Sequence, residues 1–187
     1  NGVMVKTYAP YNNELLSEFP DASESDVDLA VKSAKEAFKT WRKTTVKERA
    51  KILNKIADII DENKELLATV ETMDNGKPIR ETTLVDIPLA ATHFRYFAGC
   101  ILADEGQATV LDEKFLSLIL REPIGVVGQI IPWNFPFLMA AWKLAPALAA
   151  GDTVVLKPSS TTTLSLLVLM ELIQDVIPKG VVNLITG

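Results

Sequence analysis

The chain has 187 residues, of which 48% are hydrophobic and 23% are charged, so it can bury the core of one sizeable domain or two small ones. The net charge of −5 argues against a nucleic-acid partner, and no apolar run reaches the ~18 residues of a membrane span. The single cysteine, Cys100, excludes an internal disulfide, and no signal peptide is evident, so we expect a cytoplasmic metabolic protein.

The N-terminal part predicts a β-hairpin followed by amphipathic helices. Two short apolar runs around a turn within residues 3–19 indicate an edge hairpin. Capping boxes at Ser23 and Thr45 predict the starts of two helices, each with one apolar stripe. A third helical stretch, residues 66–73, is followed by the stop signal Asp-Asn-Gly-Lys-Pro at residues 74–78.

Residues 88–103 complete the predicted helical group and contain two residues of chemical interest. His93 has no second metal-type ligand at helical spacing, so we interpret it as an ordinary helix residue. Cys100 has no histidine or basic neighbour to lower its pKa, so we expect a buried structural thiol. Residues 107–121 then predict a long hairpin whose second strand is apolar on both faces and therefore needs a partner.

The C-terminal part alternates buried-type strands with helices. Residues 126–131 form an apolar, β-branched run that predicts a parallel strand buried on both faces. Pro136 suits the first position of a helix that ends at Gly151. Two further strands, residues 153–156 and 181–185, flank a second helix, which we expect over residues 163–176.

The order β-α-β-α-β predicts adjacent parallel strands joined by right-handed crossovers. Ligands of such sheets bind outside the carboxyl ends of the strands, where the turns at 132–136 and 157–160 lie. We therefore predict an α/β chain with helices and hairpins over residues 1–121 and a Rossmann-like parallel sheet over residues 122–187.

Several motifs together resemble the NAD(P)-dependent aldehyde dehydrogenase superfamily, and they extend over nearly the whole chain. A lone GxGxxG motif would be weak evidence for a dinucleotide fold, and this chain lacks one, which that family tolerates. The motifs are DNGKP (74–78), RYFAG (95–99), EPIGVVG (122–128), PWNFP (132–136), WKLAPALAAG (142–151), VLKPS (155–159) and PKGVVN (178–183). The resemblance implies that the two hairpins bridge subunits and that the predicted sheet is the first half of a larger one.

The resemblance implies that Asn134 helps to stabilise the oxyanion that forms when a cysteine thiolate attacks an aldehyde carbonyl. A neutral, fixed N–H donor stabilises such charge by about 3 kcal/mol. The alternative is an Asn that satisfies turn amides, which is common beside Pro.

The resemblance also implies NAD or NADP as cofactor. Lys157 would contact the adenosine ribose, with a surface lysine that caps a strand as the alternative. Many NAD-preferring relatives have Glu where this chain has Ser160, so we expect unusual tolerance of NADP; alternatively, Ser160 caps the following helix. The residues expected at the cofactor are Ile130, Ile131, Pro132, Trp133, Lys157, Ser159 and Ser160.

By the same resemblance Phe135, Met139 and Trp142 would line the substrate tunnel, although a helix face of this kind could also be plain core. Family members are more than twice as long, and their nucleophilic Cys and general-base Glu are expected outside this chain. The implied function is oxidation of a small aldehyde by a homo-oligomer, a dimer or tetramer, with no metal. Two alternatives stay open, a CoA-acylating aldehyde dehydrogenase and a non-catalytic cofactor-binding or oligomerisation module.

Overall fold

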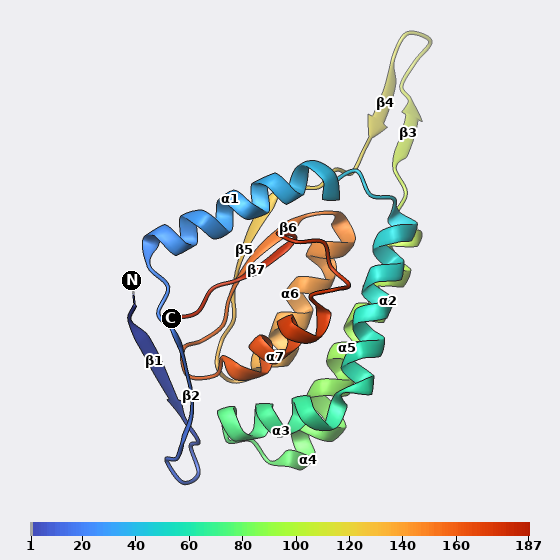
Figure 1. Ribbon diagram of the computed structural model, residues 1–187. Coiled ribbons are helices and arrows are strands. Elements are labelled where there is room, and N and C mark those ends of the chain that lie inside the picture. The colour runs from blue at the N-terminus through green and yellow to red at the C-terminus, as the bar shows by residue number, and fades with distance from the viewer. Residues whose placement is uncertain (1) are drawn as a thin grey trace.

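A three-stranded parallel sheet lies at the centre of the structure, a computed structural model that describes residues 2–187 (Figure 1). The strands are β5 (Val126–Ile130), β6 (Thr153–Lys157) and β7 (Val182–Leu184), in the spatial order β5-β6-β7. All neighbours run parallel, with Val127 opposite Val154 and Val154 opposite Val182. This confirms the predicted α/β order, in which consecutive strands lie side by side.

Two helices connect these strands. Helix α6 (Pro136–Ala150) runs between β5 and β6, and α7 (Leu164–Ile173) runs between β6 and β7. Pro136 occupies the first turn of α6 as predicted, and Gly151 ends it with a φ of 94°, in the left-handed region that favours glycine.

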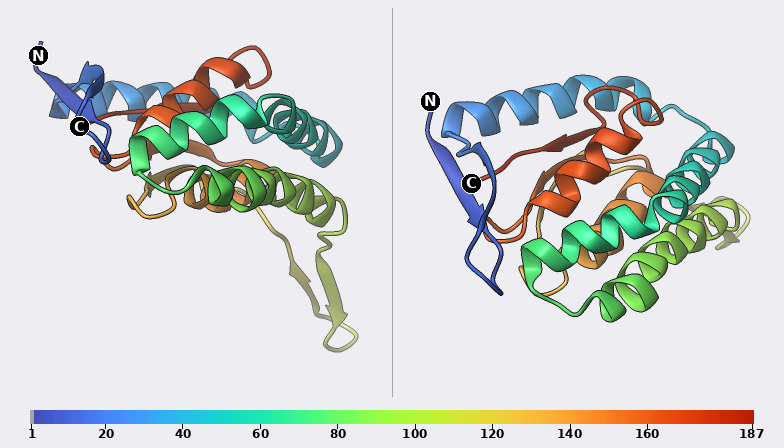
Figure 2. Two further views of the ribbon diagram at one scale, coloured as in Figure 1. Left: turned by 90° about the horizontal axis from the view of Figure 1, so that it is seen from below. Right: turned by 60° about the horizontal axis from the view of Figure 1, so that its bottom comes forward.

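Four of the remaining helices pack on α6 and α7 or on the sheet, whereas the two short ones, residues 79–81 and 82–86, pack mainly on the helices beside them (Figures 1 and 2). Reciprocal hydrogen bonds between Thr45 and Glu48, 2.8 and 3.2 Å long, confirm the second capping box. At the first, the N–H of Ser23 donates to Asp26 at 2.8 Å. The helices are α1 (Glu24–Trp41), α2 (Val46–Glu62), α3 (Lys64–Asn75), α4 (Ile79–Glu81), the π-helix η1 (Thr82–Asp86) and α5 (Ile87–Leu102).

One hydrophobic core joins the helices to the sheet. It contains the predicted apolar stripe of α2, the inner faces of α5, α6 and α7, and residues of β6 and β7. Helix α1 crosses the amino-terminal end of β6, where the Thr153 hydroxyl donates to the Ala34 carbonyl at 3.0 Å. Because this core continues across residue 121, the division of the chain into two parts at that point remains a prediction.

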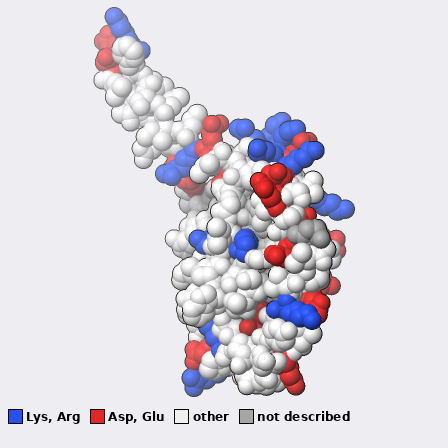
Figure 3. All heavy atoms as spheres, turned by 90° about the vertical axis from the view of Figure 1, so that its left-hand side faces the viewer, with Lys and Arg blue, Asp and Glu red and all other residues white. Residues whose placement is uncertain are grey.

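Both predicted hairpins are present. The first pairs β1 (Met4–Tyr8) with β2 (Leu15–Pro20) and lies near the carboxyl end of the sheet (Figure 1). The second pairs β3 (Gln107–Val110) with β4 (Leu116–Ile119) and projects away from the body as an arm (Figures 1 and 3). Every residue of β3 and β4 is exposed, and the charged side chains of the arm gather at its tip and base.

Two expectations about burial are wrong. Strand β5 is not buried on both faces, because Gln129 is its only buried residue and Ile130 at its end is 77% exposed. It is also an edge strand of the sheet among residues 2–187. Cys100 is exposed rather than buried, because it lies on the outer face of α5, opposite the face that carries Phe94 and Ala98 into the core. No helix in the described part of the chain is both long and apolar enough to cross a membrane.

Candidate active site

The two turns singled out in the sequence begin side by side at the carboxyl edge of the sheet. Ile130 and Lys157 are register partners at the ends of β5 and β6, and the N–H of Ile131 donates to the Lys157 carbonyl at 2.9 Å. The pairing of β6 with the following segment also reaches this edge, where Ile185 donates to Leu156 at 2.9 Å. Parallel strands therefore bring the segments 132–136 and 158–162 to one place, as the topology predicts.

Asn134 stands free in its turn. Its side chain is exposed, and within residues 2–187 it makes no hydrogen bond. The alternative that Asn134 satisfies amides of its own turn therefore finds no support in the contacts. An amide whose N–H donors are unused is available to a bound ligand.

The residues before Asn134 divide into exposed and buried ones. Ile130, Pro132 and Trp133 are exposed, and Trp133 keeps 65% of its surface accessible. Ile131 is 1% exposed and belongs to the core, so any contact of Ile131 with a ligand has to use its backbone. The side chains that can meet a ligand here are thus Ile130, Pro132 and Trp133.

Lys157 is half-buried at the end of β6, so it is not a fully solvated surface lysine. Its ammonium donates to the carbonyl oxygens of Pro158, at 3.3 Å, and Gly187. None of the ion pairs in the described part of the chain includes it. A cation without a carboxylate partner beside a sheet edge suits the hydroxyl or phosphate oxygens of a nucleotide.

The two serines after Lys157 have different roles in the turn. The Ser159 carbonyl accepts the Thr163 hydroxyl at 2.8 Å, and its own hydroxyl lies 2.9 Å from that of Thr161. Ser160 is half-buried and has no hydrogen-bond partner among residues 2–187. The alternative that Ser160 caps the following helix is wrong, because α7 begins at Leu164 and another residue caps it. A hydroxyl at position 160 is thus free for a ligand.

The predicted tunnel residues lie on and before the first turns of α6. Phe135 is 38% exposed and Trp142 is 43% exposed, so neither is plain core, whereas Met139 packs against the core. Trp142 also lies beside His93 of α5, with 5.4 Å between ring centroids. Phe135 and Trp142 are thus partly accessible to a ligand, as residues that line a tunnel have to be.

The end of α3 and the turn after it hold both turns, the one after β5 and the one after β6, and the stop signal at residues 74–78 does not by itself predict this. Asn75 donates its side-chain amide to the Trp133 carbonyl at 2.6 Å, and the Lys77 ammonium lies 3.4 Å from the centroid of the Phe135 ring. Glu71 accepts the N–H of Phe137, at the start of α6, at 3.2 Å. The DNGKP motif is thus not only a stop signal for α3 but also a support for the turn that carries Asn134.

Asp74 of the same motif supports the second loop. Its carboxyl accepts the N–H of Leu164, the first residue of α7, at 2.8 Å and the Thr7 hydroxyl at 2.9 Å. Two carboxyl groups three residues apart on α3, those of Glu71 and Asp74, therefore serve the N-termini of α6 and α7, which carry partial positive charge. The signal in the sequence is the pair of acidic residues at helical spacing directly before Asn-Gly.

Burial sets the protonation of these two carboxyls. Glu71 is 1% exposed, and burial raises its pKa to about 7, although the Ser165 hydroxyl, the Phe137 N–H and the charge of Lys77 each lower it. The Ser165 hydroxyl lowers the pKa of Glu71 although it forms no hydrogen bond of regular geometry within the described residues. Burial likewise raises the pKa of Asp74, against the hydrogen bonds from Leu164 and Thr7.

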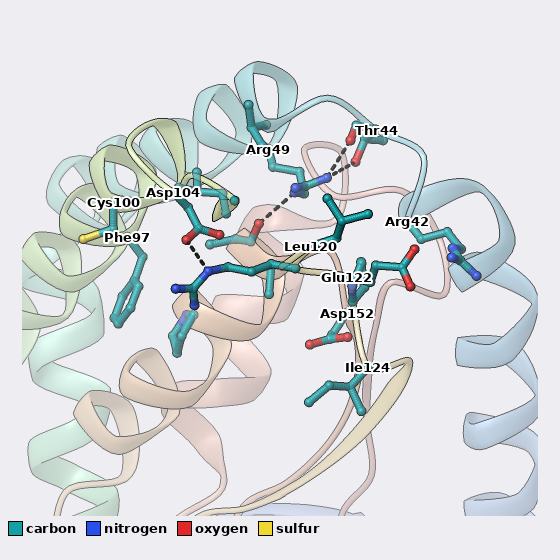
Figure 4. Close-up of a pocket in the computed structure, with 18 of the residues that line it drawn as sticks. Arg42, Thr44, Arg49, Phe97, Cys100, Asp104, Leu120, Glu122, Ile124 and Asp152 are labelled. Carbon is teal, nitrogen blue, oxygen red and sulfur yellow. Dashed lines mark hydrogen bonds and ion pairs between the residues drawn. The ribbon is translucent and has the colours of Figure 1, made fainter. Parts of the chain in front are cut away.

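A separate cavity of about 1020 Å³ lies at the opposite end of α6, under the base of the hairpin arm (Figure 4). Cys100, Arg49 and Asp152 line it, together with Ala149 and Ala150 at the end of α6. Arg49 is held there by a 2.8 Å hydrogen bond to the Ala149 carbonyl. Since α6 has 15 residues, its length separates this cavity from the turn of Asn134 by roughly 22 Å.

Cys100 is therefore not placed to react at a carbonyl that Asn134 contacts. No group of three or more His, Cys, Asp or Glu side chains in the described part of the chain could hold a metal ion.

Comparison with known proteins covers the whole chain. The sequence profile described as "Aldehyde dehydrogenase family" matches residues 1–187. The chain is 56% identical to an acetaldehyde dehydrogenase of Pseudomonas aeruginosa over 179 residues, 96% of this chain and 35% of that protein. It is 53% identical to aldehyde dehydrogenase B of Escherichia coli over 187 residues, all of this chain and 36% of that protein.

Solved structures agree with the sequence relatives. PnpE, whose crystal structure is a complex with nicotinamide adenine dinucleotide, superimposes with a TM-score of 0.97 at 45% identity, covering 100% of this chain and 38% of that one. A point mutant of betaine aldehyde dehydrogenase from Staphylococcus aureus, in complex with NAD+, gives a TM-score of 0.95 at 39% identity. The match covers 99% of this chain and 38% of that one. The chain thus spans little more than a third of the length of the proteins that it matches.

Proposed function

Because the chain belongs to the aldehyde dehydrogenase family, we propose that it is the N-terminal part of an enzyme that oxidises an aldehyde to a carboxylic acid with NAD+ or NADP+. The observation that carries the proposal is the turn after β5, which presents the unpaired Asn134 amide beside the strand end that carries Lys157. The proposed reaction consumes an aldehyde, a water molecule and the oxidised cofactor. Its products are the acid, the reduced cofactor and a proton.

Asn134 acts in this proposal on the charge that develops at the carbonyl oxygen. A thiolate from outside residues 1–187 adds to the aldehyde carbon, and the carbonyl oxygen becomes an oxyanion. The Asn134 N–H donors stabilise this oxygen without carrying a charge or titrating, since an amide is neutral throughout the pH range of proteins. The exposed parts of the Phe135 and Trp142 side chains would give apolar contact to the aldehyde chain.

A bound nicotinamide cofactor would supply the oxidant, as the acceptor of a hydride. The chemistry of the residues at the carboxyl end of the sheet fits such a group, because β6 ends in a lysine without an acidic partner and two serines lie in the turn after it. We propose that Lys157 donates to the adenosine ribose and that Ser159 and Ser160 lie next to it. Trp133, Pro132 and Ile130 would provide apolar contact with the cofactor.

The proposed function is tested with the purified full-length protein, aldehydes of increasing chain length, and either NAD+ or NADP+. Formation of reduced cofactor and of free carboxylic acid is the expected result. If an acyl thioester forms only when coenzyme A is added, the CoA-acylating alternative is correct. If no aldehyde reduces either cofactor, residues 1–187 belong to a non-catalytic member of the family.

The same assay tests the role of Cys100. Because the cavity that Cys100 lines is separated from Asn134 by the length of α6, Cys100→Ala should retain wild-type turnover. Loss of turnover in Cys100→Ala, in a protein with unchanged thermal stability, would show that the proposed nucleophile outside residues 1–187 is wrong.

A further inference from the structure

We propose that Glu71, Asn75 and Lys77, here called the α3 platform, are positioning residues that hold the Asn134 amide in its reactive place. This inference rests on the proposed function, because it assigns a task to residues that do not themselves contact the substrate. It starts from the fact that the Asn134 side chain has no hydrogen bond of its own within residues 2–187. Its position is therefore determined by the backbone on either side.

The platform contacts that backbone and its side chains at three points. Asn75 donates to the carbonyl of Trp133, the residue before Asn134, at 2.6 Å. Lys77 lies 3.4 Å from the ring centroid of Phe135, the residue after Asn134. Glu71 accepts the N–H of Phe137 at 3.2 Å. Contacts at positions −1, +1 and +3 relative to Asn134 restrain the turn from both sides.

The platform is itself firmly held. Lys77 forms a 2.6 Å ion pair with Asp86, whose side chain is 2% exposed and lies in the π-helix η1. The hydroxyls of Thr72 and Thr82 are 2.8 Å apart and join α3 to the start of η1. Gly76 adopts a φ of 85°, and a Cβ atom there would lie 3.2 Å from Pro10 of the first hairpin. Single-turn π-helices are frequent near functional sites, and here the π-turn carries the acid that fixes Lys77.

Asn75 offers the sharpest test, because its contact can be removed without exposing a buried charge. The residue is half-buried at the last position of α3, and within residues 2–187 its amide donates only to the Trp133 carbonyl. Releasing that carbonyl lets the turn shift, and displacements of about 1 Å in a reactive group can lower rates by up to 100-fold. For Asn75→Ala in the full-length enzyme we expect a decrease in kcat of about 10-fold, with the cofactor Kd unchanged.

The experiment is a double-mutant cycle with Asn134→Ala, read out as kcat for aldehyde oxidation. If Asn75 acts through Asn134, Asn75→Ala lowers kcat in the wild-type background and has no further effect in the Asn134→Ala background. Asn63→Ala is the matched control, because Asn63 also donates its amide to a carbonyl, that of Ile59 at 2.9 Å, but at the other end of α3. This control should retain wild-type kcat.

Should Asn75→Ala not fold, Asn75→Asp keeps the shape of the side chain and replaces the donor with an acceptor that repels the Trp133 carbonyl. Its decrease in kcat should be at least as large, and should likewise vanish when Asn134 is Ala. Additive effects of the two substitutions, or an unchanged kcat in both Asn75 variants, overturn the positioning role. If Asn134→Ala itself leaves kcat unchanged, the proposed function of Asn134 fails, and the positioning role fails with it.

Discussion

The carboxyl of Asp74 accepts the N–H of Leu164 at 2.8 Å and so caps a helix that begins 90 residues further along the chain. Helix α7 therefore depends on α3 for its first hydrogen bond, since its own N-cap residue, Thr163, makes no side-chain cap. The loop between β6 and α7, which contains Ser160 and follows Lys157, is thereby tied to the DNGKP motif. The same motif supports the turn of Asn134, so one short segment holds both candidate ligand loops.

The first prediction concerns the stability that this cap provides. Asp74→Ala removes a helix cap and leaves the Thr7 hydroxyl without its buried acceptor, so we expect a loss of about 2 kcal/mol or more. Asp74→Asn keeps an acceptor oxygen and should lose less. Thermal unfolding of the full-length protein measures both, with Asp28→Ala, an exposed position on α1, as control. Equal melting temperatures for Asp74→Ala and the control would contradict the role of the cap.

The second prediction concerns pH. Burial raises the pKa of Glu71 from its ordinary 4.5 to about 7, so the folded protein keeps a proton that the unfolded chain releases between these values. Stability should therefore fall as pH rises through this window, by roughly 3 kcal/mol at most. Glu71→Gln cannot ionise, and its stability should fall less over the same range.

The groups that face Glu71, namely Lys77, Asp86, Ser165 and the Phe137 N–H, are unchanged in Glu71→Gln, as is Asp74, whose pKa is also raised. As the pH rises from about 5 to about 8, the melting temperature of Glu71→Gln should thus increase relative to that of the wild type. If the melting temperatures of the two proteins change with pH in the same way, the pKa of Glu71 is not raised in the folded protein.

The third prediction concerns cofactor choice. Ser160 is half-buried, has no hydrogen-bond partner among residues 2–187 and presents no charge that would repel a 2′-phosphate. We predict that the full-length enzyme uses NADP+ as well as NAD+. Ser160→Glu should depress kcat/KM for NADP+ selectively, by about 10-fold or more, because a carboxylate repels the extra phosphate. A decrease of the same size with both cofactors would contradict this account of position 160.

The fourth prediction concerns assembly. We propose that the hairpin arm pairs with another subunit, because all residues of β3 and β4 are exposed and both strands carry apolar side chains such as Leu118 and Val110. An unpaired, apolar strand edge is a liability in a monomer. Light scattering on the full-length protein at micromolar concentration should give a dimer or tetramer, and Leu118→Lys should weaken it. A strict monomer in the wild type would exclude this role of the arm.

The sequence predicts the elements well because their signals are local. Capping boxes at Ser23 and Thr45 and the left-handed Gly151 are visible in short windows of sequence, and the structure contains each of them. The side-by-side placement of the turns after β5 and β6 also follows from topology alone. The positions of Asn134 and Lys157, in the turn after β5 and at the end of β6, follow from the same topology, whereas their roles stay predictions.

The interactions that hold the site could not be predicted in this way, because their partners lie far apart in the sequence. Glu71 and Phe137 are 66 residues apart, and Asn75 and Trp133 are 58 apart. The predictions of burial fail where composition is the only guide. Cys100 has apolar neighbours in the sequence but lies on the exposed side of α5. Strand β5 has a composition that suits a buried strand, but it is an edge strand among residues 2–187.

The most direct test of the account is the kinetics of Asn134→Ala in the full-length enzyme. Because the Asn134 amide is proposed to contact chiefly the oxyanion of the transition state, kcat and kcat/KM for the aldehyde should fall together by roughly 100-fold. The Kd of the cofactor should remain that of the wild type. An unchanged kcat, or a change confined to the cofactor Kd, would contradict the assignment of Asn134 as the oxyanion donor.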